Sequence, residues 1–351
     1  MVRSSDQSIR RQISGPLKGI RTNFPDETFD ALNATPRDLA LHFLPPRPDA
    51  RYSPTAHANW VRAMASRPRF PPNTPTAPST GDRISIGDVL IFTHPNQGVS
   101  QASSRNWSGA FIRSRNFDHT VLAQGRWIVP DTPAFEGPSF ASSIWVGLDG
   151  SDPGSRIMPQ IGTGQLARLY EFPVPLPLDI QFAWWQLWLR DFSAGRQILI
   201  PIAITRKDRI YAQVLALSSE VVSFYLKNET TNRAYAAYYY LRDDIADSMM
   251  TLERRTAEWI VERPRIPDRL GPGDKLIDVA MADYGETAFT DCNAATLSAD
   301  DRLQEFQLQR ARLIKMNLWD DDLHPGRLAS KPERVGDDAI QMTYVDSPRA
   351  V

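Results

Sequence analysis

The sequence has a single cysteine, Cys292, and it lacks any long apolar run. One cysteine excludes an intramolecular disulfide and a zinc site built from several thiolates, and we expect it to be a small buried hydrophobe. No segment approaches the ~18 consecutive apolar residues that a membrane-spanning helix requires. The basic N-terminus is not followed by the apolar stretch of ~7–15 residues that a secretory signal contains, so no such signal is visible.

Neither sign of charge dominates. Lys and Arg together number 40, Asp and Glu number 41, and the formal net charge is −1. This balance gives no electrostatic reason to expect a nucleic acid or a membrane surface as partner. Hydrophobic residues make up 42% of the chain, which is enough for a real core and argues against wholesale disorder. We expect a monomeric globular protein.

Several catalytic signatures are also missing. No HxxxH or HExxH pair is present, which argues against a zinc peptidase, and no GxSxG elbow marks a serine hydrolase. Asp131 and Thr132 are followed by Pro133 instead of the glycine that an aspartic peptidase loop needs. The GTG stretch at 162–164 is too weak to indicate nucleotide binding. The sequence therefore gives no reason to expect a metal or a cofactor.

Proline is abundant and unevenly placed. The chain contains 28 prolines, and the stretch RPRFPPNTPTAP at 67–78 is typical of an extended linker, because proline fixes φ and removes a backbone donor. We expect three parts: an N-terminal helical extension or pro-segment at 1–66, a Pro-rich linker at 67–102, and a main domain at 103–351.

Two short helices are predicted before the linker. Thr35 is placed to cap a helix beginning at Pro36. A second helix begins near Thr55, and its Trp60 and Met64 lie on one face with Val61 beside them. These helices are too small to bury a core alone. They either dock on the main domain or belong to a removable pro-segment.

A pro-segment of this composition would act through charge. Its basic residues would pair with an acidic cleft and be released when the carboxylates become protonated. A processing site within the Pro-rich stretch, at Arg67 or Arg69, fits the ease with which exposed chain is cleaved. The basic residues in question are Arg3, Arg10, Arg11, Lys18 and Arg21.

From about Ser103 onward the sequence consists of short β-rich runs separated by turn residues. Many runs alternate large apolar residues with small or polar ones, as half-buried antiparallel strands do. Their spacing indicates a two-sheet sandwich or a barrel. The stretch at 301–317 remains ambiguous between helix and strand. No alternation of strands with helices supports a Rossmann-type fold.

Six tryptophan-rich motifs follow one another in this region. They are NWSG at 106–109, WIVP at 127–130, WVGLDG at 145–150, QIG at 160–162, AWWQLW at 183–188 and AEWIVE at 257–262. The ordered series, over residues 105–292, resembles the glutamic endopeptidases (eqolisins). The resemblance implies an all-β fold, namely an antiparallel two-sheet β-sandwich of the concanavalin A-like or jelly-roll type. It also implies a polypeptide substrate, no cofactor and secretion, although no signal peptide is visible.

The resemblance places the catalytic pair on Glu262 and Gln160. Glu262, as a carboxylate, can take a proton from water and return it to the leaving amine. Gln160 cannot ionise, but its amide can donate to the developing oxyanion. Further residues are carried over as substrate-binding candidates: Trp107, Trp145, Asp149, Trp184, Gln186 and Glu258.

Strand periodicity adds one expectation of its own. Glu258, Ile260 and Glu262 share one face of a strand, and Trp259 and Val261 share the other. Two carboxylates on one face predict that this face meets solvent or a cleft.

Alternative roles remain open for several of these residues. Gln160 can cap a turn through backbone hydrogen bonds, Asp149 fits a tight turn equally well, and the tryptophans can belong to the core. Gln186 occupies a position where the family has glutamate, which would alter the pH profile, the specificity or the activity. A catalytically silent sandwich that binds an extended peptide or a glycan is therefore the alternative to a peptidase.

Overall fold

A computed structural model describes the chain from residue 17 to residue 345 with internal gaps. The described ranges are 17–72, 98–100, 102–114, 118–132, 140–152, 154–170, 176–189, 197–245, 250–267, 276–297, 302–306, 308–318 and 327–345. Within these ranges no helix is both long enough and apolar enough to cross a membrane.

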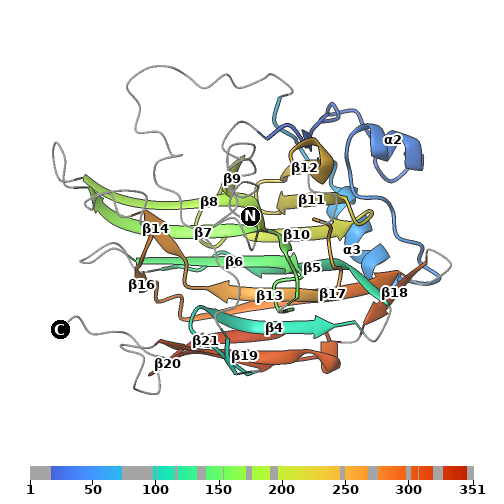
Figure 1. Ribbon diagram of the computed structural model, residues 1–351. Helices are drawn as coiled ribbons and strands as arrows, with labels where there is room; N and C mark the ends of the chain where they lie inside the picture. Colours follow the sequence, from blue (N-terminus) through green and yellow to red (C-terminus); the bar gives the residue numbers. More distant parts are fainter. Residues whose placement is uncertain are drawn as a thin grey trace, which may run out of the picture.

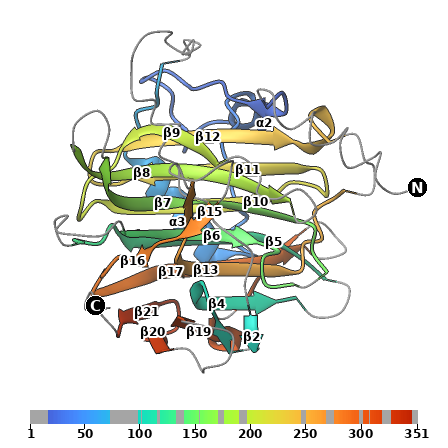
Figure 2. The same cartoon turned by 60° about the vertical axis from the view of Figure 1, so that its left-hand side comes forward.

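Two antiparallel sheets face each other, and we refer to them as the front sheet and the back sheet (Figures 1 and 2). The front sheet runs in the order β9 (Gln197–Ala203), β8 (Leu176–Leu189), β7 (Ile157–Tyr170), β6 (Phe140–Leu148), β13 (Thr256–Glu262) and β4 (Trp107–Arg113). The back sheet runs in the order β12 (Arg233–Tyr240), β11 (Val221–Asn228), β10 (Arg209–Ala216), β5 (His119–Ile128), β17 (Glu286–Leu297) and β18 (Leu303–Phe306). The predicted all-β sandwich is confirmed.

Shorter strands link the two sheets along one edge. β19 (Arg312–Leu318) pairs with β4 of the front sheet, and β21 (Ile340–Tyr344) pairs with β17 of the back sheet. The remaining short strands are β2 (Gly98–Ser100), β3 (Ser103–Ser104), β14 (Arg265–Pro267), β15 (Leu276–Asp278), β16 (Ala280–Met281) and β20 (Arg327–Arg334). The ambiguous stretch at 301–317 therefore forms strands β18 and β19 with a 3₁₀ turn, Leu308–Arg310, between them.

The main core lies between the facing sides of the two sheets. Trp185 of β8 stacks on Phe224 of β11 with ring centroids 4.8 Å apart. Two other indoles donate across the gap: Trp127 Nε1 donates to Thr163 Oγ1 at 3.0 Å, and Trp259 Nε1 donates to the Gln124 carbonyl at 2.8 Å. Large aromatic rings thus fill the core, and the N–H groups of Trp127 and Trp259 find acceptors, which avoids the cost of burying these two donors unpaired.

Residues 17–72 lie on the outer side of the back sheet. They contain β1 (Ile20–Arg21), α2 (Pro36–Leu41) and α3 (Pro54–Ala65). The predicted Thr35 cap is confirmed, because Thr35 and Asp38 form a reciprocal capping box. The second helix begins at Pro54, one residue before the predicted start. The Pro-rich linker continues into residues 73–97, which lie outside the described residues.

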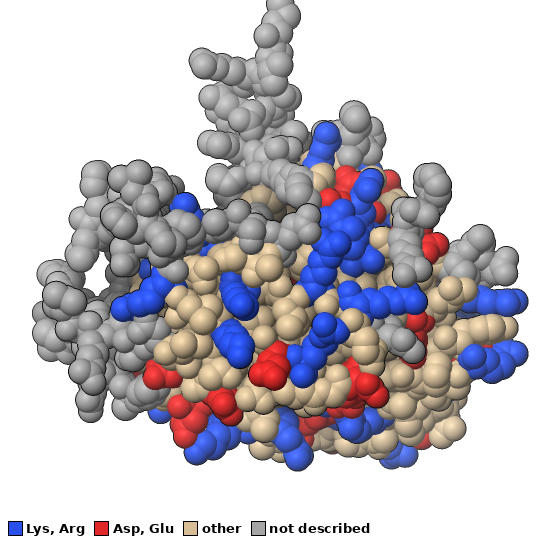
Figure 3. Space-filling view, turned by 90° about the horizontal axis from the view of Figure 1, so that it is seen from below, with Lys and Arg blue, Asp and Glu red and all other residues tan. Residues whose placement is uncertain are grey.

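Charged side chains of both signs share the lower face of the molecule. In Figure 3, Lys and Arg side chains stand among Asp and Glu side chains on this face. This mixture agrees with a net charge close to zero.

Candidate active site

The outward side of the front sheet carries the candidate residues. Strand alternation sends Glu258, Ile260 and Glu262 of β13 to this side, because Trp259 and Val261 enter the core between the sheets. A second apolar cluster lies on the same outward side. Its aromatic members are Trp107, Phe111, Trp145, Phe182, Trp184 and Trp188.

Glu262 is held by two donors. Trp145 Nε1 donates to Glu262 Oε2 at 2.8 Å, and Asn106 Nδ2 lies 3.5 Å from Glu262 Oε1. The side chain of Glu262 is fully buried. A hydrogen bond to a charged acceptor in such a site is stronger than one between neutral groups, so the indole fixes the position of this carboxylate.

Trp145 lies between the two proposed catalytic residues. Its backbone is opposite Gly162, where a Cβ would lie only 2.5 Å from Trp145 Cβ. At Gly147, a Cβ would lie 3.0 Å from Trp145 Cζ3 and 3.2 Å from Gln160 Cβ. The indole therefore extends from the vicinity of Gln160 at one end to Glu262 at the other, and the glycines leave room for it.

The strand register defines how Gln160 is placed relative to the carboxylates. Gln160 is opposite Gln186 on β8 and Gly147 on β6, and Gly147 is in turn opposite Glu258. Glu262 belongs to a different row, opposite Ser143. One row lies between the row of Gln160 and the row of Glu262, and it contains Ile260, Trp145, Gly162 and Trp184. Gln160 and Glu262 thus share a face, two strands and two rows apart, with Trp145 between them.

Glu258 occupies the same row as Gln160. Its Oε1 accepts the Ser151 backbone N–H at 2.9 Å, and the side chain is fully buried. Burial raises the pKa of Glu258 to about 8, although hydrogen bonds from Thr256 and Ser151 oppose the shift. Glu258 is therefore a neutral acid over the acid pH range.

Asp149 is placed at the end of β6 in a turn. Its φ is +70°, a left-handed conformation that Asp tolerates. Its carboxylate accepts the backbone N–H groups of Arg254 at 2.7 Å and Arg255 at 2.6 Å. Burial raises the pKa of Asp149 to about 7. These contacts tie β6 to the segment before β13, which favours the turn role over direct substrate contact.

The face that was predicted to meet solvent or a cleft carries its key side chains in a buried position, away from open solvent. Glu258, Glu262, Gln160 and Gln186 are all 0% exposed. Trp107, Trp145 and Trp184 are equally buried, and Trp107 meets Trp145 edge-to-face with centroids 4.9 Å apart. The carboxylates lie among indole rings, and Glu262 accepts a hydrogen bond from one of them, which compensates part of its desolvation.

Asn106 was missing from the predicted site residues. It precedes β4, directly before Trp107, which pairs with Glu262 in the strand register. Ser104 accepts the backbone N–H of Asn106 at 3.2 Å and donates to Asn106 Oδ1 at 2.9 Å. Asn106 is the first residue of the NWSG motif, so the motif already pointed to it. Its contact with Glu262 became evident only from the pairing of β4 with β13.

Over the described ranges, no cluster of three or more His, Cys, Asp or Glu side chains could hold a metal ion.

Comparison with known proteins gives three results. Residues 105–344 match the model of the Peptidase A4 family. Scytalido-glutamic peptidase, solved with a transition state analog inhibitor, aligns with a TM-score of 0.51 and 21% identity over 69% of this chain and 98% of that chain. Aspergilloglutamic peptidase from Aspergillus niger aligns with a TM-score of 0.41 and 26% identity over 59% of this chain and 99% of that chain.

A comparison with curated proteins gave no significant match. The family match covers more than half of the chain, and the likeness to scytalido-glutamic peptidase agrees with it at the level of the fold. The chain belongs to the Peptidase A4 family, the glutamic endopeptidases, and is a peptidase.

Proposed function

We propose that this peptidase hydrolyses peptide bonds with Glu262 as general base and acid and Gln160 as the oxyanion donor. The observation that carries the proposal is the 2.8 Å hydrogen bond from Trp145 Nε1 to Glu262 Oε2. It fixes a buried carboxylate on the same face as Gln160, and the Trp145 ring lies between the two. A positioned carboxylate and a neutral amide are the groups that this reaction needs.

The reaction balances without a covalent intermediate. Glu262 takes a proton from water, and the resulting hydroxide attacks the carbonyl carbon of the scissile bond. The Gln160 amide donates to the oxyanion that forms. As the tetrahedral intermediate collapses, the C–N bond breaks and Glu262 returns the proton to the leaving amine. The products are a carboxylic acid and an amine.

Acid conditions suit two further carboxyl groups of this region, Asp149 and Glu258. The raised pKa values of Asp149, about 7, and Glu258, about 8, keep both groups neutral in acid. In that range neither adds negative charge at the end of the face where Glu258 shares a row with Gln160. At higher pH both would ionise in a buried environment, which is unfavourable for the fold.

The alternative is a silent sandwich that binds a peptide or a glycan. Gln186, a neutral residue opposite Gln160, is the observation in its favour. Sugar stacking requires exposed aromatic faces, and the full burial of Trp107, Trp145 and Trp184 argues against that form of binding.

Digestion of denatured casein tests the proposal. We expect cleavage to peak in acid over a series from about pH 2 to about pH 7, because the reaction depends on a carboxyl group. Glu262→Gln should abolish cleavage, while the matched control Glu333→Gln, at an exposed position of β20, should retain it. Binding of casein without turnover by the wild type at every pH would favour the silent sandwich.

A further inference from the structure

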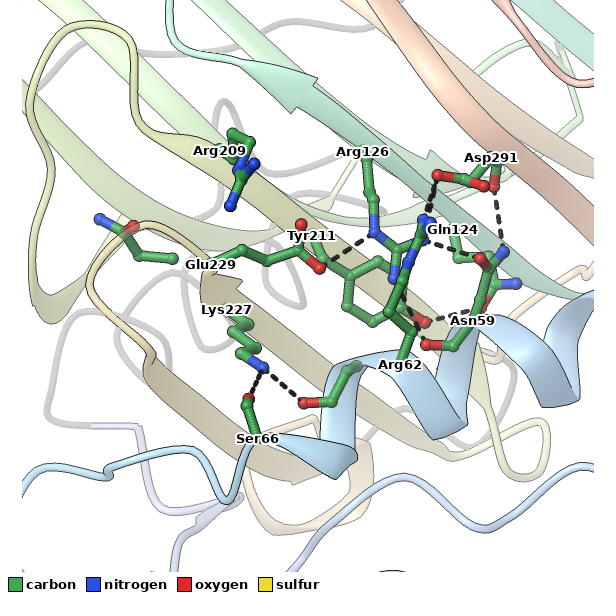
Figure 4. A network of polar contacts seen from close by, with 12 residues as sticks. Asn59, Arg62, Ser66, Gln124, Arg126, Arg209, Tyr211, Lys227, Glu229 and Asp291 are labelled. Carbon is green, nitrogen blue, oxygen red and sulfur yellow. Dashed lines mark hydrogen bonds and ion pairs between the residues drawn. The ribbon is translucent and has the colours of Figure 1, made fainter.

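The outer face of the back sheet has a cover of its own. We call residues 17–72 the N-terminal layer. It contacts the back sheet at one edge through β1 and across the face through α3 (Figures 1 and 4). The front sheet, with the candidate active site, lies on the opposite side of the main core.

Apolar burial fixes the layer to the sheet. Trp60 and Met64 of α3 are 1% and 2% exposed, and they belong to one cluster with residues from both the layer and the sheet. The buried members of this cluster are Ala31, Leu39, Leu44, Trp60, Ala63, Met64, Tyr211, Tyr225, Ala234 and Ala236. Removing the layer would expose this apolar surface to water, which opposes its release.

The back sheet also caps both ends of α3. At the N-terminal end, the Ala56 backbone N–H donates to Glu305 Oε1 at 2.6 Å. At the C-terminal end, Lys227 Nζ donates to the Ala63 carbonyl at 2.7 Å and to Ser66 Oγ at 2.5 Å (Figure 4). A carboxylate at the start and an ammonium at the end match the helix dipole.

Arg126 of β5 ties the middle of α3 to the sheet. Its Nη1 donates to Asn59 Oδ1 at 2.7 Å, and its Nε pairs with Glu229 at 3.0 Å (Figure 4). A second carboxylate, Asp291, lies 3.3 Å from Nη1 and also pairs with Arg62 of α3. The Arg126 side chain is only 8% exposed, so removal of the layer would take a hydrogen-bond partner from a buried charge.

The start of the layer joins the sheet edge directly. Ile20 and Arg21 of β1 pair with Tyr239 and Tyr238 of β12. The backbone N–H groups of Lys18 and Gly19 both donate to the Asp244 carboxylate, at 2.9 Å and 2.8 Å. Two of the basic residues expected to reach an acidic cleft, Lys18 and Arg21, thus lie at the edge of the back sheet, while Arg3, Arg10 and Arg11 lie outside the described residues.

We propose that the N-terminal layer is a permanent third layer of the folded peptidase and does not inhibit it. A chain that is cut between residues 72 and 98 would remain a two-fragment complex, in which the layer covers the back sheet and not the face that carries the candidate active site. The binding part of this proposal is independent of the proposed function; only its activity readout rests on that function.

Retention should persist in acid. Four carboxylates contact the layer directly, and these contacts weaken when the carboxylates are protonated: Asp243, Asp244, Asp291 and Glu305. A fifth, Glu229, pairs with Arg126 within the main domain. Other contacts use neutral acceptors that do not titrate. These are the hydrogen bonds of Lys227 to Ala63 and Ser66, and the hydrogen bond of Arg126 to Asn59. Burial lowers the pKa of Lys227 to about 8, so Lys227 is protonated and donates throughout the acid range.

The test is a specific cut in the full-length protein. A protease recognition sequence is inserted between residues 73 and 97, and the chain is cut. The product is run on a gel-filtration column at about pH 3 and about pH 8, which lie below and above the ordinary range of carboxyl pKa values. We expect both fragments to co-elute in equal amounts, and casein cleavage to change by less than about two-fold, because the active site lies on the other sheet.

Two results would overturn the proposal. Separation of the fragments at either pH would show that the layer is not permanent, and a large rise in casein cleavage after the cut would show that it inhibits. If the uncut protein never cleaves casein, the proposed function fails, while co-elution still tests the layer.

Two lysine variants test whether Lys227 helps to hold the layer on the sheet. Lys227→Met keeps the apolar stem of the side chain but removes the donor at the end of α3. We expect it to weaken retention of the layer after the cut by about ten-fold or more, since a hydrogen bond from a charged group is lost. Lys331→Met, at an exposed position of β20, should leave retention unchanged. Equal retention in the two variants would contradict the role of Lys227.

Discussion

The two outward faces of this sandwich are both buried, but they are buried differently. On the back sheet, apolar contacts and charged groups that pair with helix α3 attach a covering layer. On the front sheet, two carboxyl groups and two amides lie among indole rings, and one carboxyl group has a pKa raised by burial. The first face resembles an ordinary structural interface. The second buries polar and ionisable side chains that the fold itself does not require, which indicates a catalytic role for this face.

The comparison gives a rule for mutations. Changes on the outer face of the back sheet should alter stability and leave turnover intact. Changes to Gln160 and Glu262, on the outward face of the front sheet, should alter turnover and leave stability intact.

Trp60→Ala should have the largest effect on stability. The side chain is 1% exposed, and large-to-small changes of buried aromatic residues cost ~3–5 kcal/mol. We expect the free energy of unfolding in urea to fall by that amount, while kcat of the remaining folded enzyme is unchanged. Leu41→Ala, at a position that is 61% exposed, is the matched control. A large fall in kcat for Trp60→Ala would break the rule.

Gln160→Ala should act on turnover. Removal of one oxyanion donor costs ~10²–10³ in kcat in enzymes that use this device. We expect a loss of this size in casein or peptide hydrolysis, with a circular dichroism spectrum equal to that of the wild type. An undiminished kcat would remove Gln160 from the mechanism and leave it a residue of the β7–β8 pairing.

Trp145→Phe should have a smaller effect on turnover. The variant keeps most of the ring but loses the N–H that donates to Glu262. Because a hydrogen bond to a charged group is worth ~1.5–3 kcal/mol, kcat should fall by roughly 10–100-fold. Steady-state kinetics with a peptide substrate would show whether the loss is in kcat, as expected for positioning. A change confined to KM would instead assign Trp145 to substrate binding.

Glu258→Gln should change how stability depends on pH. The pKa of Glu258 is raised from 4.5 to about 8, so its stabilising contribution is complete below about pH 4.5 and is lost as the pH rises through about 8. The variant should match the wild type near pH 4 and be more stable by roughly 1–2 kcal/mol near pH 8, a figure discounted for coupling to Asp149. Thermal melts at both pH values provide the measurement. Equal melting temperatures at pH 8 would contradict the buried neutral acid.

Much of the fold could be predicted from local sequence. Alternating patterns gave the strands, and the Thr35 cap and the Trp60 face gave the two helices. Strand pairing could not be predicted in the same way, because it joins residues far apart in the chain, such as Trp107 and Glu262. The contact of Asn106 with Glu262 depends on that pairing, so the sequence motif alone did not assign it a role.

Burial on the front sheet was the other feature that the sequence did not predict. The presence of Glu258 and Glu262 on one strand face predicted that the face meets solvent or a cleft, since carboxylates are seldom buried without partners. Their burial depends on partners from other strands and turns: Trp145 for Glu262, and Ser151 for Glu258. Likewise, the helical pattern of α3 did not predict that Lys227 and Arg126 of the back sheet would donate hydrogen bonds to this helix.

The most direct test of the account measures activity and stability together in Glu262→Gln. Peptide hydrolysis at the acid optimum and the midpoint of urea unfolding are determined on the same preparation. The account predicts that kcat falls by at least ~10²-fold, as for loss of a general acid–base group, while the unfolding midpoint stays near that of the wild type. Hydrolysis at the wild-type rate, or a loss of activity that merely follows a loss of folded protein, would contradict it.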